Sequence, residues 1–180
     1  MKKSMRKLIV CLAVAVVSIG VMAETKPFNL SLTPNVAVYP RTDTIEGLTL
    51  SVWGENRQTS LALGIVNGTI GESAGLSWGF LNYADYYKGI QWSAINYTKD
   101  NFLGWQSGLM DYTKGTMMGL QAGVLNFAGR LTGLEFGLVN YTDDVDSGLQ
   151  IGLVNIVRNN NSWLSDFPNS LAPTMILVNW

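Results

Sequence analysis

Few residues of this chain are of a type that supports catalysis or metal binding. The sequence contains no histidine and a single cysteine, Cys11, which excludes Ser-His-Asp and Cys-His triads and histidine-based metal sites. The remaining candidates are carboxylates, and two of them, Asp111 and Glu135, stand inside segments that carry no other charge. A pair of carboxylates can act as general acid and base, so these two residues are the first chemistry to consider.

Neither the carboxylate pair nor an acidic turn is expected to form a site. Asp111 and Glu135 occupy different places in a sequence repeat, so we interpret them as a variant of an asparagine column and as a polar lumen or surface residue. Asp144 and Asp146 precede Gly148 as in a fragment of a calcium loop, but the terminal glutamate ligand is missing. We therefore predict a solvated acidic turn, no catalytic, cofactor or metal site, and no enzyme activity.

These acids lie in or beside a nine-residue phrase that recurs along most of the chain. The clearest copy is 148–156, and others are 60–68, 75–83, 89–97, 104–112, 119–127 and 133–141, with a degenerate copy at 47–55. Successive copies start about 14 or 15 residues apart, which indicates a repeat architecture. We number the positions one to nine; position eight is a column made of Asn67, Asn82, Asn96, Asp111, Asn126, Asn140 and Asn155.

The alternation within each copy is typical of strands. Positions two, four and six are mainly apolar, whereas positions one, three and five carry glycine or small and polar residues. This period of two predicts strands of about nine residues joined by turns of about five or six. Within the seven good copies Asp111 and Glu135 are the only charged residues, and the others fall between copies. Both faces of the strands are therefore expected to be fully or partly shielded from water.

The N-terminus has the pattern of a secretory signal peptide. Four basic residues precede an apolar run over 8–21 and a small residue, Ala23. We predict cleavage after residue 23 and a single domain over 24–180. Loss of these four leaves 8 of the 12 basic residues against 13 acidic ones, a net charge of −5. No basic patch remains, which argues against a nucleic-acid partner.

The segments that flank the copies differ from them. Residues 28–39 alternate but are interrupted by Pro34, which predicts an edge or closing strand in two short pieces. Residues 157–173 are rich in Asn, Ser and Pro and are expected to form the longest loop. Residues 174–180 predict a final strand that ends on Trp180.

The favoured architecture is an antiparallel meander of about ten short strands closed into a small outer-membrane barrel. Spanning strands of about 9 to 11 residues alternate lipid-facing apolar residues with small or polar lumen residues. The aromatic residues at position nine would then lie at both membrane interfaces. Under this hypothesis membrane lipid is the partner and Trp180 is a C-terminal insertion signal.

The alternative is a β-solenoid in which each copy forms one coil of 14–15 residues. Identical orientation would explain why every copy has the same sequence, and it would stack the asparagine column into a side-chain ladder. The evenly long linkers also favour it. We rank it second because the outward face of a secreted solenoid should be more polar than these copies are.

The segments 119–126 and 148–155, GLQAGVLN and GLQIGLVN, resemble the Gly-Leu-Gln-x-Gly-Leu-x-Asn repeats of a group of bacterial surface-repeat proteins. The resemblance covers residues 47–156 and implies a cell-envelope location without any catalytic residues. We therefore expect a non-enzymatic protein of the outer membrane or cell surface, a small barrel with a structural or surface role. The alternative is a periplasmic, secreted or surface-attached solenoid scaffold that binds a partner through a flat strand face.

Overall fold

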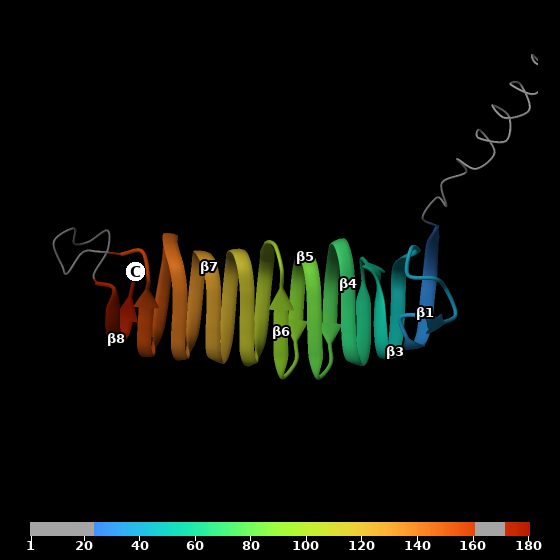
Figure 1. Ribbon diagram of the computed structural model, residues 1–180, viewed down its shortest axis with the longest axis horizontal. Coiled ribbons are helices and arrows are strands. Elements are labelled where there is room, and N and C mark those ends of the chain that lie inside the picture. Colours follow the sequence, from blue (N-terminus) through green and yellow to red (C-terminus); the bar gives the residue numbers. More distant parts are fainter. Residues whose placement is uncertain (1–23, 161–171) are drawn as a thin grey trace, which may run out of the picture.

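The computed structural model describes residues 24–160 and 172–180, and these form a β-solenoid whose coils stack along one long axis (Figure 1). The predicted signal peptide and most of the predicted loop at 157–173 lie outside the described residues. The strands are β1 (Thr25–Thr33), β2 (Val36–Ala37), β3 (Thr44–Gln58), β4 (Leu61–Trp78), β5 (Leu81–Trp92), β6 (Ile95–Thr98), β7 (Phe102–Val157) and β8 (Thr174–Asn179). The prediction of an all-β repeat fold is confirmed.

Neighbouring coils pair in parallel, with equivalent repeat positions side by side. Asn67 pairs with Asn82, Asn82 with Asn96, and Asn96 with Asp111. The favoured antiparallel meander closed into a barrel is therefore wrong, and the solenoid alternative is correct. The physical reason is that one coil returns the chain to the same angular position, so that identical side chains stack and bond to their own copies.

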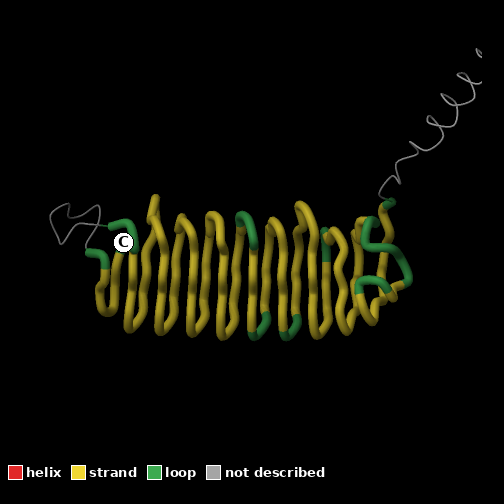
Figure 2. The backbone as a smooth tube through the Cα atoms, in the orientation of Figure 1, coloured by secondary structure: helices red, strands yellow, loops and turns green. Residues whose placement is uncertain are grey.

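The predicted boundaries between strands and turns also change. β7 continues as strand for 56 residues, through several copies and the segments between them (Figure 2). The segments between copies pair along the axis as well, as in the bond from the amide of Gly115 to the carbonyl of Asp100 at 2.9 Å. Corners that repeat in register extend the ladder, so most of the predicted turns are strand.

The glycine at position one of most copies is required by the bend at which the copy begins. Gly104 and Gly119 have φ values of 135° and 130°, a region that side chains with a Cβ rarely adopt. A Cβ on Gly104 would also lie 2.0 Å from the carbonyl oxygen of Gly89 in the preceding coil. Glycine at this position therefore permits both the bend and the close stacking of coils.

Each end of the stack is covered by a strand that departs from the repeat. At the N-terminal end, β1 pairs in parallel with β3, which holds the degenerate copy, and short β2 pairs antiparallel with β1. These two pieces on either side of Pro34 match the predicted interruption. At the other end, β8 pairs antiparallel with β7. Trp180 follows β8; its role as an insertion signal was inferred from the barrel, which does not form.

The interior contains little apolar material. One apolar cluster is formed by the residues that lie two places before the first glycine of successive copies. Tyr87 and Phe102 stack at a ring-centroid distance of 6.0 Å, and Met117 and Leu131 continue the row in the next coils. Most of the other buried side chains of the described residues are polar. Among those residues, no helix is long and apolar enough to cross a membrane.

Candidate functional site

The asparagine column runs along the inside of the solenoid as a hydrogen-bonded ladder. Each Nδ2 donates to Oδ1 of the next coil: Asn67 to Asn82 at 3.0 Å, and Asn82 to Asn96 at 2.9 Å. Asn140 continues the same pattern to Asn155 at 2.7 Å. Most members also donate to a backbone carbonyl, as Asn67 does to Trp78. Except at the step after Asp111, the column satisfies its buried amides internally, which makes it a structural element.

A second ladder at position three lies beside the first. Gln121 donates Nε2 to Gln106 Oε1 at 2.8 Å, and Gln106 donates to Gln91 at 2.9 Å. Threonines that follow some of the copies reinforce it, since Thr113 Oγ1 donates to Gln106 Oε1 at 2.9 Å. Polar residues at position three are visible in the sequence, but the alternation within one copy does not predict this ladder. Their recurrence every 14 or 15 residues was the available signal.

Asp111 interrupts the asparagine ladder. Asn96 donates to its Oδ1 at 2.7 Å, but within the described residues its Oδ2 and the Oδ1 of Asn126 in the next coil both have no hydrogen-bond partner. Both oxygens lie within 3.0 Å of the position that a Cβ on Gly123 would take. This step of the ladder therefore offers two unpaired acceptors, where the other steps have a donor and an acceptor.

Burial raises the pKa of Asp111 to about 6, although bonds from Asn96 and the Gly108 backbone lower it. A protonated Asp111 carries the donor that this step of the ladder lacks, whereas the carboxylate has none. The acid thus replaces asparagine most favourably when it is neutral. Its position among buried amides matches its interpretation as a variant of the column.

Glu135 takes the place of glutamine in the second ladder. Its two oxygens accept from Thr142 Oγ1 at 3.0 Å and Gln150 Nε2 at 2.8 Å, while Gln121 Oε1 in the preceding coil has no partner among the described residues. Burial raises the pKa of Glu135 to about 7, and the two bonds lower it. The two acids therefore lie in separate ladders, and the structure does not bring them together as a catalytic pair.

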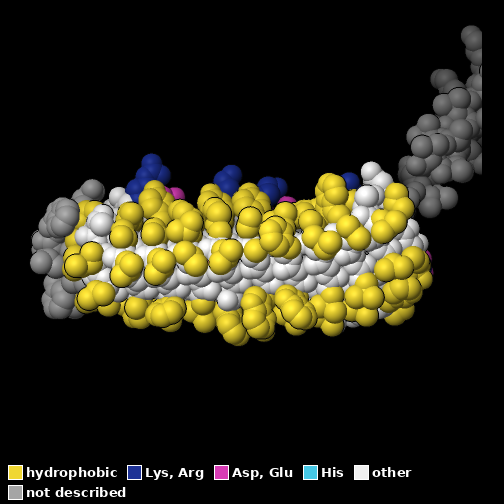
Figure 3. Space-filling model, turned by 90° about the horizontal axis from the view of Figure 1, so that it is seen from below, with side chains coloured by type: hydrophobic (Ala, Val, Ile, Leu, Met, Phe, Trp, Pro, Cys, Tyr) yellow, Lys and Arg dark blue, Asp and Glu magenta, His cyan; other side chains and the backbone are white. Residues whose placement is uncertain are grey.

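The outward-facing side chains of the coils are mostly apolar, in contrast to the polar ladders inside. Positions two, four, six, seven and nine point outward, and none of them carries a charged residue in any of the seven good copies. We call this surface the apolar wedge, because it covers two walls that meet at the lower corner of the coils in Figure 1. Seen from below, two rows of apolar side chains flank a pale stripe of backbone (Figure 3). The most exposed members are Ile65, Trp78, Phe80, Trp92, Leu109, Phe136, Leu138 and Leu153.

Aromatic residues stack along both walls. Tyr97 and Tyr112 lie 5.5 Å apart between ring centroids, and Tyr112 and Phe127 6.1 Å apart. On the other wall, Trp92 lies 6.4 Å from Trp78 and 6.5 Å from Trp105. A shallow groove between the two apolar rows is lined by Trp78, Trp92, Ser107 and Leu109, among others.

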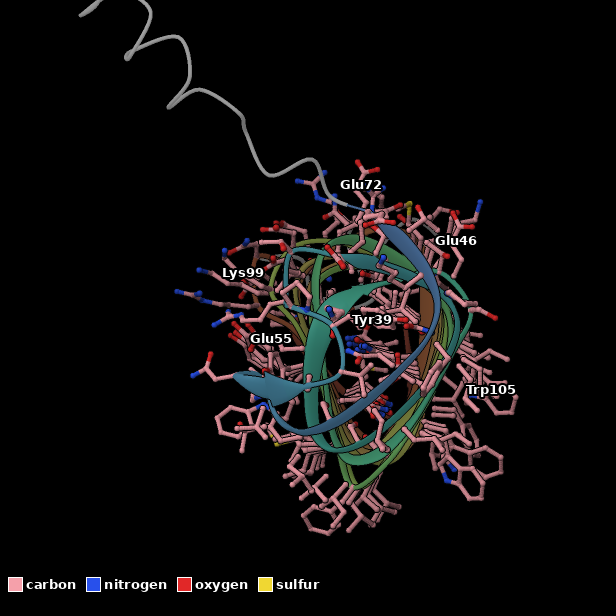
Figure 4. All side chains as sticks on the ribbon, turned by 90° about the vertical axis from the view of Figure 1, so that its right-hand side faces the viewer. Tyr39, Glu46, Glu55, Glu72, Lys99 and Trp105 are labelled. Carbon is pink, nitrogen blue, oxygen red and sulfur yellow. The ribbon has the colours of Figure 1, made fainter. Side chains whose placement is uncertain are left out.

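Charged side chains collect at the opposite corner, which we call the charged edge. In the view down the axis, Glu72 lies at the top of the coil and Lys99 at the upper left, whereas Trp105 lies at the lower right (Figure 4). The acidic turn belongs to this edge: Asp146 pairs with Arg130 at 3.1 Å, and Asp143 with Arg158 at 3.2 Å. Among the residues that the structure describes, no three His, Cys, Asp or Glu side chains group as a metal site.

Searches against family models, curated proteins and solved structures found no significant match to this chain.

Proposed function

We propose that this protein is an exported, non-enzymatic β-solenoid scaffold of the cell envelope, located at the outer membrane or cell surface, which binds a partner through its apolar wedge. The observation that carries the proposal is the absence of charge from every outward position of seven consecutive copies. Soluble monomers rarely expose contiguous apolar patches larger than a few hundred Å². An exposed apolar surface of this kind is expected to be covered by a binding partner.

The buried acids support a scaffold over an enzyme. Asp111 and Glu135 have relative exposures of 0 % and lie within ladders of amide side chains. A general acid or base must come within hydrogen-bond reach of its substrate, and both acids are closed off by the coils on either side. Their contacts explain them as ladder members.

The docking role can be tested with one variant and a matched control. Leu109 and Leu138 lie at the lower corner and are 63 % and 51 % exposed. The corner variant, Leu109→Glu with Leu138→Glu, should fold but shift from the envelope fraction to the soluble fraction of fractionated cells. The control, Ser147→Glu, places a glutamate at an exposed position of the charged edge and should remain in the envelope fraction. Equal distribution of both variants and the unchanged chain would contradict the proposal.

Export is tested separately by N-terminal sequencing of the protein recovered from the envelope. The signal pattern predicts a mature chain that begins at Glu24. Recovery of a chain that still begins at Met1 would contradict cleavage.

A further inference from the structure

We infer that the partner of the apolar wedge is a lipid surface, in which the solenoid lies with its long axis parallel to the membrane plane and its lower corner immersed. This inference rests on the proposed function, since it names the partner of the same surface. It follows from the shape of the wedge, from the direction of the backbone hydrogen bonds and from the placement of charge.

The shape of the wedge favours a fluid partner. Apolar side chains cover the wall with Trp78 and Trp92, turn the lower corner through Phe80 and Leu109, and continue up the other wall to the tyrosine row. A second copy of the chain that packs on one wall leaves the other exposed to water. Hydrocarbon chains can cover both walls and the corner together, which buries all of the charge-free surface.

The backbone can enter hydrocarbon on this side at little cost. Hydrogen bonds between coils run along the axis, so that the walls do not present open strand edges. Even at the lower corner, the amides of Gly79 and Ser93 donate to the carbonyl oxygens of Trp92 and Ser107 at 3.1 Å each. An unpaired backbone group costs several kcal/mol in a bilayer core. The walls avoid this cost, whereas the two ends of the stack do not, so the axis must lie parallel to the surface.

The charged residues and the tyrosines lie at the positions relative to the lower corner that the polar interface of a bilayer requires. Lys99 lies at the charged edge, away from the lower corner (Figure 4), and the pairing of Thr98 with Thr113 gives Lys114 the equivalent place in the next coil. Tyr97 and Tyr112 precede these lysines by two residues, so their row lies between the charged edge and the corner. Tyrosine and tryptophan favour the level of the lipid headgroups, where one end of the ring is wet. The coil therefore has the amphipathic order of a monotopic element: apolar corner, aromatic row, charged edge.

The net charge of −5 for residues 24–180 makes electrostatic attraction to anionic lipid unnecessary and unfavourable. Binding should therefore occur on zwitterionic vesicles and change little with salt. The test mixes the exported, purified chain with phosphatidylcholine vesicles and follows flotation at low and high salt. We expect the unchanged chain and Ser147→Glu to float at both salt concentrations. The corner variant should bind with an affinity at least roughly tenfold lower, since two leucines that would be buried in lipid are replaced by charges. Circular dichroism verifies that all three chains contain the same strand structure.

Depth is measured with phosphatidylcholine brominated at different acyl positions. Bromine in the upper half of the acyl chain should quench tryptophan fluorescence, and Trp78→Phe with Trp92→Phe should remove most of the quenching because those two rings flank the immersed corner. A chain that floats without this quenching contradicts the orientation.

The outcomes separate this inference from the proposed function. If the unchanged chain stays at the bottom of the gradient but forms oligomers or a protein complex that the corner variant loses, the lipid assignment is overturned and the docking function stands. If the chain neither floats nor associates, and the corner variant fractionates in cells like the unchanged chain, both are overturned.

Discussion

The inside and the outside of the coil reverse the usual distribution of residues. Inside, columns of Asn and Gln side chains are fully buried, and outside, Trp, Phe and Leu side chains are more than half exposed. In a globular core an isolated polar side chain is costly. Here most of the buried amides meet an equivalent amide one coil away, so repetition itself provides the donor and the acceptor. In a short-period solenoid of this kind the inner surface therefore determines stability, whereas the outer surface is free to serve binding.

The largest predicted effect comes from the inner stacking of backbone. Gly104→Val should prevent folding or cost more than about 4 kcal/mol, because its φ is 135° and a Cβ would lie 2.0 Å from the Gly89 carbonyl oxygen. Circular dichroism and urea denaturation measure the loss. Gly71→Ala is the matched control: its φ is 61°, but no atom lies within 4 Å of the added Cβ. It should cost about 1 kcal/mol, and equal losses would show that φ alone is responsible.

A reciprocal exchange tests the comparison directly. Asn82 Oδ1 accepts from Asn67 at 3.0 Å and Ser77 Oγ at 2.9 Å, and its Nδ2 donates to Asn96 at 2.9 Å. Asn82→Leu keeps the number and branching of the heavy atoms but removes these bonds inside the ladder, so it should lower the free energy of unfolding by about 3 to 5 kcal/mol. Leu138→Asn, on the outside, should change it by less than about 0.5 kcal/mol. Similar losses in urea denaturation would contradict the assignment of stability to the inner surface.

The sequence could predict the all-β class, the repeat period and the interruption at Pro34, because strand periodicity and proline chemistry are local properties. It did not determine strand polarity, since alternation with a period of two is the same in parallel and antiparallel strands. The expectation of a polar outer surface then favoured the barrel, although this solenoid is apolar outside. The ladders depend on contacts between residues about 15 apart, which no single copy specifies.

One signal against the barrel was nevertheless present. Position eight has the same parity as the apolar positions two, four and six, so a flat nine-residue strand would point the asparagine column toward lipid. In the structure the chain bends at the lower corner, between positions three and eight, and the bend exchanges which alternate positions face inward. Gln121 and Asn126 therefore both point inward, whereas Leu120 and Val124 point outward. A buried amide column with this parity indicates a bent coil.

The next effect concerns the ladder step at Asp111 and its pH dependence. The folded pKa of about 6 is above the ordinary value of 3.8, so the folded chain binds more protons between these values. The contribution of Asp111 to stability is therefore fully present below pH 4, falls as pH rises toward 6, and is lost above it. Glu135, with a pKa raised from 4.5 to about 7, acts in the same direction over a slightly higher window.

Asp111→Asn restores the donor that the step toward Asn126 lacks at high pH. It should raise the free energy of unfolding by on the order of 2 to 3 kcal/mol at pH 8 and by little at pH 4. Urea denaturation at several pH values measures the difference. Asp143→Asn, at the charged edge, is the control and should not produce this pH dependence. An Asp111→Asn chain that is less stable than the parent at pH 8 would show that Asp111 is held there as a needed anion.

The smallest effect is expected at the charged edge. Arg130 and Asp146 are joined at 3.1 Å, but their side chains are 50 % and 51 % exposed. Water and salt screen such a pair, and exposed pairs contribute about 0 to 1 kcal/mol. Arg130→Ala should therefore lower stability by less than about 0.5 kcal/mol and leave flotation with vesicles unchanged, because the edge stays in water. A larger loss of stability would mean that the ion pairs between coils assist the ladders, and reduced flotation would mean that this edge contacts the headgroups.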